Sequence, residues 1–262
     1  MHESQTLFSA YFVVGLCGAL VGSFLNVCIY RLPRRESIAW PGSHCTGCSH
    51  PIAWYDNIPI VSYILLRGRC RNCAVAIPYR YPVVEALNAL GYVWIVWGFG
   101  MTWSAAVYGV LYSALLVVAG TDLSHKIIPN AITFPGMVLG LLSATTILPL
   151  GFFNGLLGLL VGGGILWLLA WASPFLFGKA GMGGGDIKLL AMIGAFLGWK
   201  PAVMTIMVGS FLGSLVGISL IAAKVIRRED YIPFGPFLVG GALVSLFFGQ
   251  SLLDWYQGLL AG

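Results

Sequence analysis

Two aspartates stand where long apolar segments meet polar loops, and their type and setting are suited to acid–base chemistry. Asp122 lies in the stretch GTDLSHKIIPN at residues 120–130, and Asp186 lies in GMGGGDIKLL at residues 181–190. Two carboxyl groups a few ångströms apart cannot both ionise easily, so one can act as an acid while the other acts as a base. Such a pair can activate a water molecule for attack on a peptide carbonyl.

Each aspartate also has a structural interpretation, which the sequence leaves open. Asp122 could be an interfacial acid that pairs with Lys126 or His125. Asp186 could cap the N-terminus of the helix that follows it, where a negative charge is favourable.

The glycines before Asp186 favour the catalytic interpretation. Glycine adopts positive φ angles readily and lets another backbone approach closely. We therefore expect the run that contains Gly183 and Gly185 to interrupt the helix and to receive an extended peptide beside Asp186.

Four cysteines form two Cys-x2-Cys pairs that are separated by 21 residues, namely Cys45, Cys48, Cys70 and Cys73. This spacing is typical of a structural zinc site with four thiolate ligands. Two disulfides are the alternative, and His44 or His50 could replace one cysteine as a ligand. A cytosolic loop keeps its thiols reduced, which favours zinc. A metal with four protein ligands has no open position, so we expect a scaffold rather than a catalytic centre.

The composition shows what must position these groups. Of the 262 residues, 58% are hydrophobic and only 9% are charged, and the mean hydropathy is +0.89. Soluble domains carry roughly 25% charged residues, so the sequence predicts a polytopic membrane protein. The net charge of +5 then reflects membrane topology and not binding to nucleic acid.

Apolar segments long enough to cross a bilayer, about 17–25 residues, predict an all-α protein with about eight transmembrane helices. We place them at residues 7–30, 82–99, 103–121, 131–149, 155–177, 187–199, 201–223 and 234–253. The segment at 187–199 is too short for a straight crossing, so it could be a half-helix or could continue into the next span. The first segment has no basic stretch before it, which favours a permanent span over a cleavable signal peptide.

The basic residues indicate the orientation. With the N-terminus outside, 13 of the 14 Lys and Arg residues lie on the inner side, and Lys200 is the exception. The inner side then also holds both aspartates and residues 31–81, the one large polar segment. Within that segment the apolar stretch at 57–66 is too short to cross, and we expect it to form the core of a small domain. Gly18 and Gly22 have the small-xxx-small spacing of closely packed membrane helices.

Several of these motifs occur together and in one order. They are GSFLNVCIYRLPR at 22–34, the two cysteine pairs, RYPVVEAL at 80–87, Asp122 followed by IIPN, GGGD at 183–186 and IPFGPFL at 232–238. In this combination the chain resembles the type IV prepilin peptidases, a family of GxGD-type aspartyl proteases of the bacterial inner membrane. The resemblance covers nearly the whole chain.

The resemblance implies an activity and a cellular location. Members of the family remove a short basic leader from prepilins or pseudopilins, cutting after a glycine at the cytosolic boundary of the membrane. Many then methylate the new N-terminal residue with S-adenosylmethionine. The resemblance assigns catalysis to Asp122 and Asp186, the motif glycines to Gly183 and Gly185, and zinc to the four cysteines.

It also implies three domains and one further site residue. Residues 1–30 would be the first transmembrane helix, residues 31–81 a cytosolic zinc-binding domain, and residues 82–262 a transmembrane aspartyl protease core. Glu85 matches a family position near the cytosolic domain, where it could serve methyl transfer or substrate binding, or only form an ion pair with Arg80.

One departure from the family and two alternative functions complete the interpretation. Many relatives have IPD where this chain has IPN, with Asn130 in the last position, so we do not expect a third catalytic carboxylate there. A peptidase without methyltransferase activity is the first alternative. An ion-coupled transporter that uses the two aspartates is the second, although the predicted position of both acids at span ends speaks against it. We expect prepilin or pseudopilin substrates and the lipid bilayer as partners, and no nucleic acid. The sequence does not indicate an oligomeric state.

Overall fold

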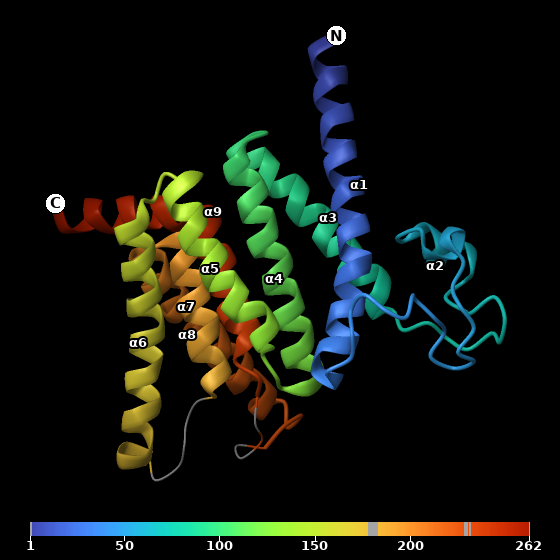
Figure 1. Ribbon diagram of the computed structural model, residues 1–262. Coiled ribbons are helices and arrows are strands. Elements are labelled where there is room, and N and C mark those ends of the chain that lie inside the picture. Colours follow the sequence, from blue (N-terminus) through green and yellow to red (C-terminus); the bar gives the residue numbers. More distant parts are fainter. Residues whose placement is uncertain (1, 178–182, 228–229, 231, 262) are drawn as a thin grey trace. The chain divides into compact units, whose positions relative to one another are not determined.

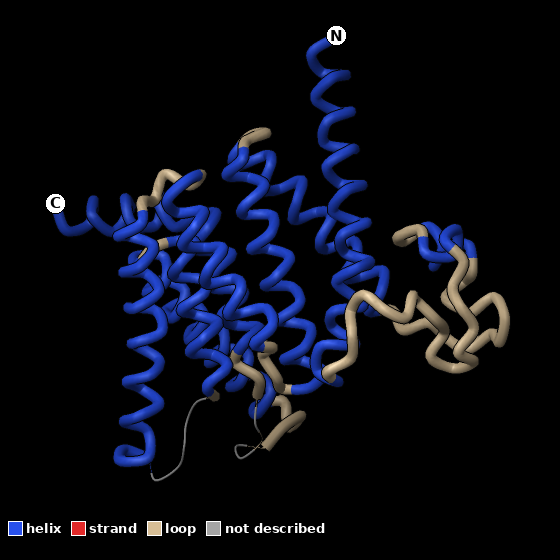
Figure 2. The backbone as a smooth tube through the Cα atoms, in the orientation of Figure 1, coloured by secondary structure: helices blue, strands red, loops and turns tan. Residues whose placement is uncertain are grey.

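The computed structural model describes residues 2–177, 183–227, 230 and 232–261 (Figure 1). It divides into two compact units, Met1–Val117 and Val118–Gly262. In the described ranges the backbone consists of helices and loops without a strand (Figure 2), and the only strand-like pairs are two isolated bridges, His44 with Pro51 and Arg69 with Ala76. The prediction of an all-α protein is confirmed.

The first unit is built on two helices that pack closely, α1 (His2–Arg31) and α3 (Arg80–Phe99) (Figure 1). A Cβ atom on Gly18 would lie 2.8 Å from the Cα of Ala89, and one on Gly22 would lie 2.7 Å from the Cα of Glu85. Because both distances are shorter than Cβ contacts allow, only glycine permits this helix spacing. The small-residue pattern therefore does set the packing, and it fixes the position of Glu85 on α3.

Between α1 and α3 the chain forms a loop-rich module with three short helices, η1 (Leu32–Arg34), η2 (Trp54–Asn57) and α2 (Val61–Leu65). The prediction that residues 57–66 form its core is wrong. Ile64 and Leu65 are 66% and 75% exposed. A five-residue helix offers one apolar face, and a module of this size has too little chain to cover that face with a second layer.

The second unit contains the end of α4 (Trp103–His125) and five further helices: α5 (Asn130–Thr146), α6 (Phe152–Phe177), α7 (Gly184–Leu197), α8 (Trp199–Ala222) and α9 (Gly235–Ala261). Helix α7 forms the core of this unit. Its residues from Leu189 to Leu197 are all buried, and it packs against α5, α6 and α8. Gly158 on α6 and Gly194 on α7 are in backbone contact, so neither position could carry a side chain.

All eight predicted spans are helices in the described residues, and six of these helices are long and apolar enough to cross a membrane. The chain is therefore a multi-pass membrane protein. The other two, α5 and α7, have 17 and 14 residues. Gly198, with φ of 88°, separates α7 from α8, so the short segment does not continue into the next span.

Candidate active site and metal centre

The two aspartates lie in the same unit and are both withdrawn from solvent. Asp122 is in the last turn of α4 and Asp186 is in the first turn of α7. Their side chains are 3% and 4% exposed. The two residues are 64 positions apart in the sequence, but the end of α4 and the start of α7 both belong to the second unit.

Asp122 receives a hydrogen bond from the start of a third helix. The backbone N–H of Gly235 donates to Oδ2 of Asp122 over 2.9 Å, and the bond is buried. Gly235 is the first residue of α9 and is followed by proline, which has no N–H to offer. A helix N-terminus carries a partial positive charge and unpaired N–H groups, so it stabilises a negative carboxylate.

Asp186 lies outside the six candidate spans and has a raised pKa, of about 6. Burial is the main cause, since it disfavours the charged carboxylate. The charge of Asp122 adds to this effect, while a hydrogen bond from the backbone of Gly183 opposes it. The raised pKa of Asp186 thus depends mainly on burial and in part on Asp122.

The glycine run differs from its prediction in conformation. Gly183 is the N-cap of α7 with an extended backbone (φ of −77°), and Gly184 and Gly185 already belong to α7, so none of these three glycines adopts positive φ. Gly181 lies outside the described residues. At Gly185 a Cβ would lie 3.0 Å from the side-chain Cβ of Ile128, and at Gly184 nothing lies within 4 Å of a Cβ, so the close approach of another backbone stays a prediction. The proposal that Asp186 is the N-cap is wrong, because Gly183 occupies that position.

Asn130 takes part in a different contact of the second unit. Its Oδ1 accepts a hydrogen bond of 2.6 Å from Nζ of Lys188, two residues after Asp186. The amide thus joins the start of α5 to α7 without contributing a carboxylate.

The four cysteines of the first unit meet in one cluster, with all sulfur atoms within 4.8 Å of one another. The sulfurs of Cys45 and Cys73 are 3.7 Å apart. Four thiolates around a metal at about 2.3 Å stand roughly 3.8 Å from one another, so the cluster fits a tetrahedral metal ion. All six cysteines are free, which contradicts the disulfide alternative, and neither histidine belongs to the cluster.

Two hairpins with the same hydrogen bonds present these cysteines. In the first, the N–H of Cys45 donates to the carbonyl of His50 over 2.9 Å, and in the second the N–H of Cys70 donates to that of Val75 over 2.9 Å. The residue after each second cysteine, Ser49 or Ala74, has φ of 56°. Backbone N–H groups of Cys73 and Asn72 point at the Cys70 sulfur and lower its pKa to about 7, which favours the thiolate that a metal requires.

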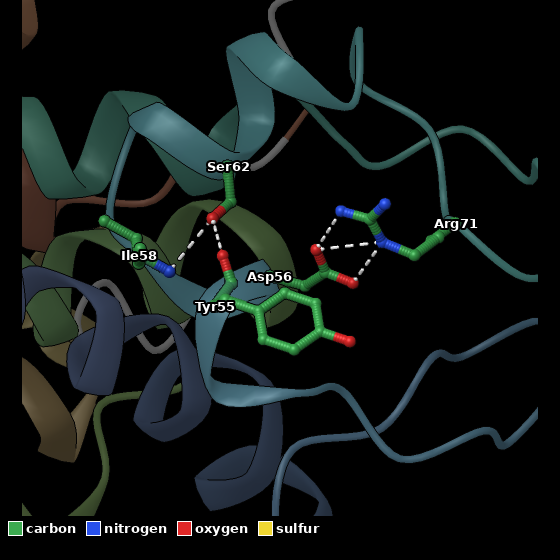
Figure 3. Close-up of polar contacts among 5 residues, drawn as sticks. All are labelled: Tyr55, Asp56, Ile58, Ser62 and Arg71. Carbon is green, nitrogen blue, oxygen red and sulfur yellow. Dashed lines mark hydrogen bonds and ion pairs between the residues drawn. The ribbon is translucent and has the colours of Figure 1, made fainter.

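A polar cluster braces the second hairpin (Figure 3). The guanidinium of Arg71 forms a bidentate ion pair with Asp56, with a shortest distance of 2.6 Å, and this charge lowers the pKa of Asp56. Ser62 donates to the carbonyl of Tyr55 over 2.8 Å and accepts from the N–H of Ile58 over 3.0 Å. The segment between the hairpins is therefore tied by side chains to the hairpin that carries Cys70 and Cys73.

The side chain of Glu85 is hydrogen-bonded to the backbone of this module. It is 7% exposed, and its Oε2 accepts a 2.8 Å hydrogen bond from the N–H of Ile60. Ile60 has φ of 62°, which is strained for a β-branched residue. Strain of this kind persists only where surrounding contacts enforce it, and here it directs the N–H to the carboxylate.

We expect the cluster to bind about one metal ion per chain, measured by elemental analysis of the purified full-length protein. Cys70→Ser removes one of four thiolates. It should abolish stoichiometric metal binding, because a structural site loses most of its affinity for the metal when one ligand is removed. Cys17→Ser, which lies on α1 and outside the cluster, is the matched control. Stoichiometric metal in Cys70→Ser would contradict this assignment.

The family models and the relatives that match this chain all indicate the same family. Residues 16–99 match the model of the bacterial peptidase A24 N-terminal domain, and residues 109–218 match that of the type IV leader peptidase family. A protein of Pseudomonas aeruginosa is 35% identical, with 92% of this chain and 91% of the relative aligned. One of Xanthomonas campestris is 37% identical, with 91% of each chain aligned.

A protein of Myxococcus xanthus is 41% identical over 83% of this chain and 64% of its own length. All three relatives carry the name prepilin leader peptidase/N-methyltransferase. No solved structure gave a significant match. The matched domains and the relatives' coverage together show that the chain belongs to the type IV leader peptidase family.

Proposed function

We propose that this chain cleaves the leader peptide from type IV prepilins or pseudopilins and N-methylates the new N-terminal residue. What supports the peptidase activity is that Asp122 and Asp186 are both buried in the same unit, and that Asp122 contributes to the raised pKa of Asp186. The names of the relatives supply the substrate class and the second activity.

In this proposal the two aspartates have different roles. Asp122, which accepts the Gly235 N–H, is the ionised base and takes a proton from the attacking water. Asp186, with its raised pKa, is the protonated acid and donates its proton to the carbonyl oxygen of the scissile bond. The resulting diol collapses as the C–N bond breaks: Asp122 passes its proton to the leaving nitrogen, and Asp186 recovers a proton from the diol.

The glycines of the GxGD motif leave room for the substrate. Gly183 and Gly185 flank Gly184, where a side chain would meet nothing within 4 Å. An extended peptide can therefore approach the N-terminus of α7 beside Asp186, and we assign the motif glycines to that role.

The first unit would carry the second activity. We propose zinc as the metal of the four cysteines, with a structural role, and residues 31–81 as the zinc-binding domain between a first transmembrane helix at 1–30 and a protease core at 82–262. S-adenosylmethionine supplies a methyl group on a positively charged sulfur. Glu85 would attract that charge and accept the proton that the N-terminal amine loses on methylation.

The same proposal places the protein in the bacterial inner membrane with its N-terminus outside. The zinc-binding domain and both aspartates then face the cytosol, and the basic loops support this orientation. A prepilin inserted as a helix would present its leader on that side.

Asp122→Asn and Asp186→Asn should each reduce leader cleavage by about a hundred- to ten-thousandfold, the usual contribution of an acid–base group. The assay follows one prepilin by mass spectrometry with purified enzyme. Asp254→Asn, an exposed carboxylate on α9, should cleave normally. Near-normal turnover in either folded dyad variant would sink the proposal.

Gly235→Ala should reduce cleavage by about a hundredfold, because misplacing a catalytic group by about 1 Å has that effect. The new Cβ would stand 2.6 Å from Oδ2 of Asp122, so the carboxylate must move. Gly240→Ala on the same helix is the control, since its Cβ would meet only the flexible end of Leu212 at 3.3 Å. Equal turnover of both variants would remove Gly235 from the site.

Glu85→Gln should leave leader cleavage intact and reduce incorporation of labelled methyl into the cleaved pilin. Glu36→Gln, an exposed acid of the same unit, is the matched control and should retain both activities. Equal loss of cleavage and methylation in Glu85→Gln would point to a folding role, and full methylation would exclude Glu85 from the reaction.

A further inference from the structure

The first unit contains a cavity of about 300 Å³ between its hairpins and the facing ends of α1 and α3. This volume lies at the lower end of the range of small-molecule sites, about 300–1,000 Å³. The aspartates of the peptidase do not line it, and both belong to the other unit. Polar groups from α1, the loop and α3 converge on it, which is what a built ligand site requires.

A buried acceptor without a partner lines this cavity. Asn26 is 1% exposed, and its Nδ2 donates to the carbonyls of Tyr81 and Gly22 over 3.0 and 3.4 Å. Those two bonds fix the orientation of the amide. Its Oδ1 then has no donor within reach among the described residues. A buried oxygen in this state is stabilised by a ligand that brings an N–H group.

A buried cation lines the same cavity. Arg31 is 6% exposed, and its guanidinium donates to the carbonyls of Ser37 over 2.9 Å and Gly42 over 3.2 Å. Both acceptors are neutral carbonyls, and among the described residues no carboxylate forms an ion pair with Arg31. Guanidinium has five N–H donors, so several remain for an anionic ligand group such as a carboxylate.

The cavity also offers the opposite charge and aromatic surfaces. Glu85 lines it on α3, with Oε2 held by Ile60. Tyrosine rings complete the lining, including Tyr55 and Tyr63. A ligand that satisfies all these groups carries a carboxylate, a cationic centre with N–H donors, and a planar ring that can lie on tyrosine.

We infer that this cavity binds S-adenosylmethionine, with Arg31 on the carboxylate of its amino-acid end and Asn26 on one of its N–H groups. The inference rests on the proposed methyltransferase function and adds to it the location of the methyl donor. Cys45 and Cys70 line the same space, so the metal cluster would hold its wall in place. The zinc-binding domain and the methyl-donor site are then one structure.

The test compares two ligands by calorimetry on the full-length, metal-loaded protein. S-adenosylhomocysteine has the amino-acid end, whereas 5′-methylthioadenosine lacks it. Arg31→Gln should weaken the binding of S-adenosylhomocysteine by about ten- to hundredfold, as expected for a lost charge-assisted bond. The affinity for methylthioadenosine should change by less than about twofold. Arg35→Gln, an exposed arginine four residues further on, should change neither.

Asn26→Leu is a second variant, in which the new side chain is similar in size to asparagine but has no polar atoms. It should weaken the binding of S-adenosylhomocysteine by about tenfold. Metal content and leader cleavage check that each variant is folded. If the unmutated protein binds S-adenosylhomocysteine but both folded variants bind it equally well, or if Arg31→Gln weakens both ligands alike, the site is wrong while the function stands. If the unmutated protein neither binds this ligand nor methylates, the methyltransferase function fails and the site with it.

Discussion

Burying two carboxyl groups in an apolar helical unit is the constraint on which the second half of this structure depends. A carboxylate withdrawn from water is strongly destabilised unless hydrogen bonds or a shared proton compensate. Asp122 receives the N–H at the start of α9, and burial raises the pKa of Asp186, at the start of α7, to about 6, which favours its neutral form. The end of α4 meets the start of α9, where Gly235 donates to Asp122, and Asp186 lies at the start of the buried α7, which packs against α5, α6 and α8.

The first unit is stabilised differently, because its polar module is too small and too exposed to be stabilised by apolar packing. Trp54 and Ile64, for example, are largely exposed. Its order comes from the cysteine cluster, the Asp56–Arg71 ion pair and the bond from Ile60 to Glu85. A chain that supports peptide cleavage and methyl transfer would thus use separate units for each, one organised by buried acids and the other by a metal.

Much of this could be predicted from the sequence, since long apolar runs specify helices and the spacing of the two Cys-x2-Cys pairs indicates that the four cysteines converge. The contribution of Gly235 could not, because its hydrogen bond joins residues 113 positions apart and depends on how α9 meets α4. A glycine followed by proline at the start of an apolar run was the available signal. The glycines before Asp186 suggested an irregular backbone with positive φ, whereas Gly183 is extended with negative φ and Gly184 and Gly185 begin a helix. Exposure of residues 57–66 also escaped prediction, since apolarity does not say whether a covering layer exists.

The central claim is that Asp122 and Asp186 act on each other as a pair, and infrared titration of the protonated carboxyl band tests it most directly. In the unmutated protein, Asp186, identified by comparison with Asp186→Asn, should titrate at about pH 6. In Asp122→Asn the neighbouring negative charge is gone, so the pKa of Asp186 should fall, by the amount that like-charge repulsion had added. An unchanged pKa of Asp186 in Asp122→Asn would show that the two groups do not interact and would contradict the account.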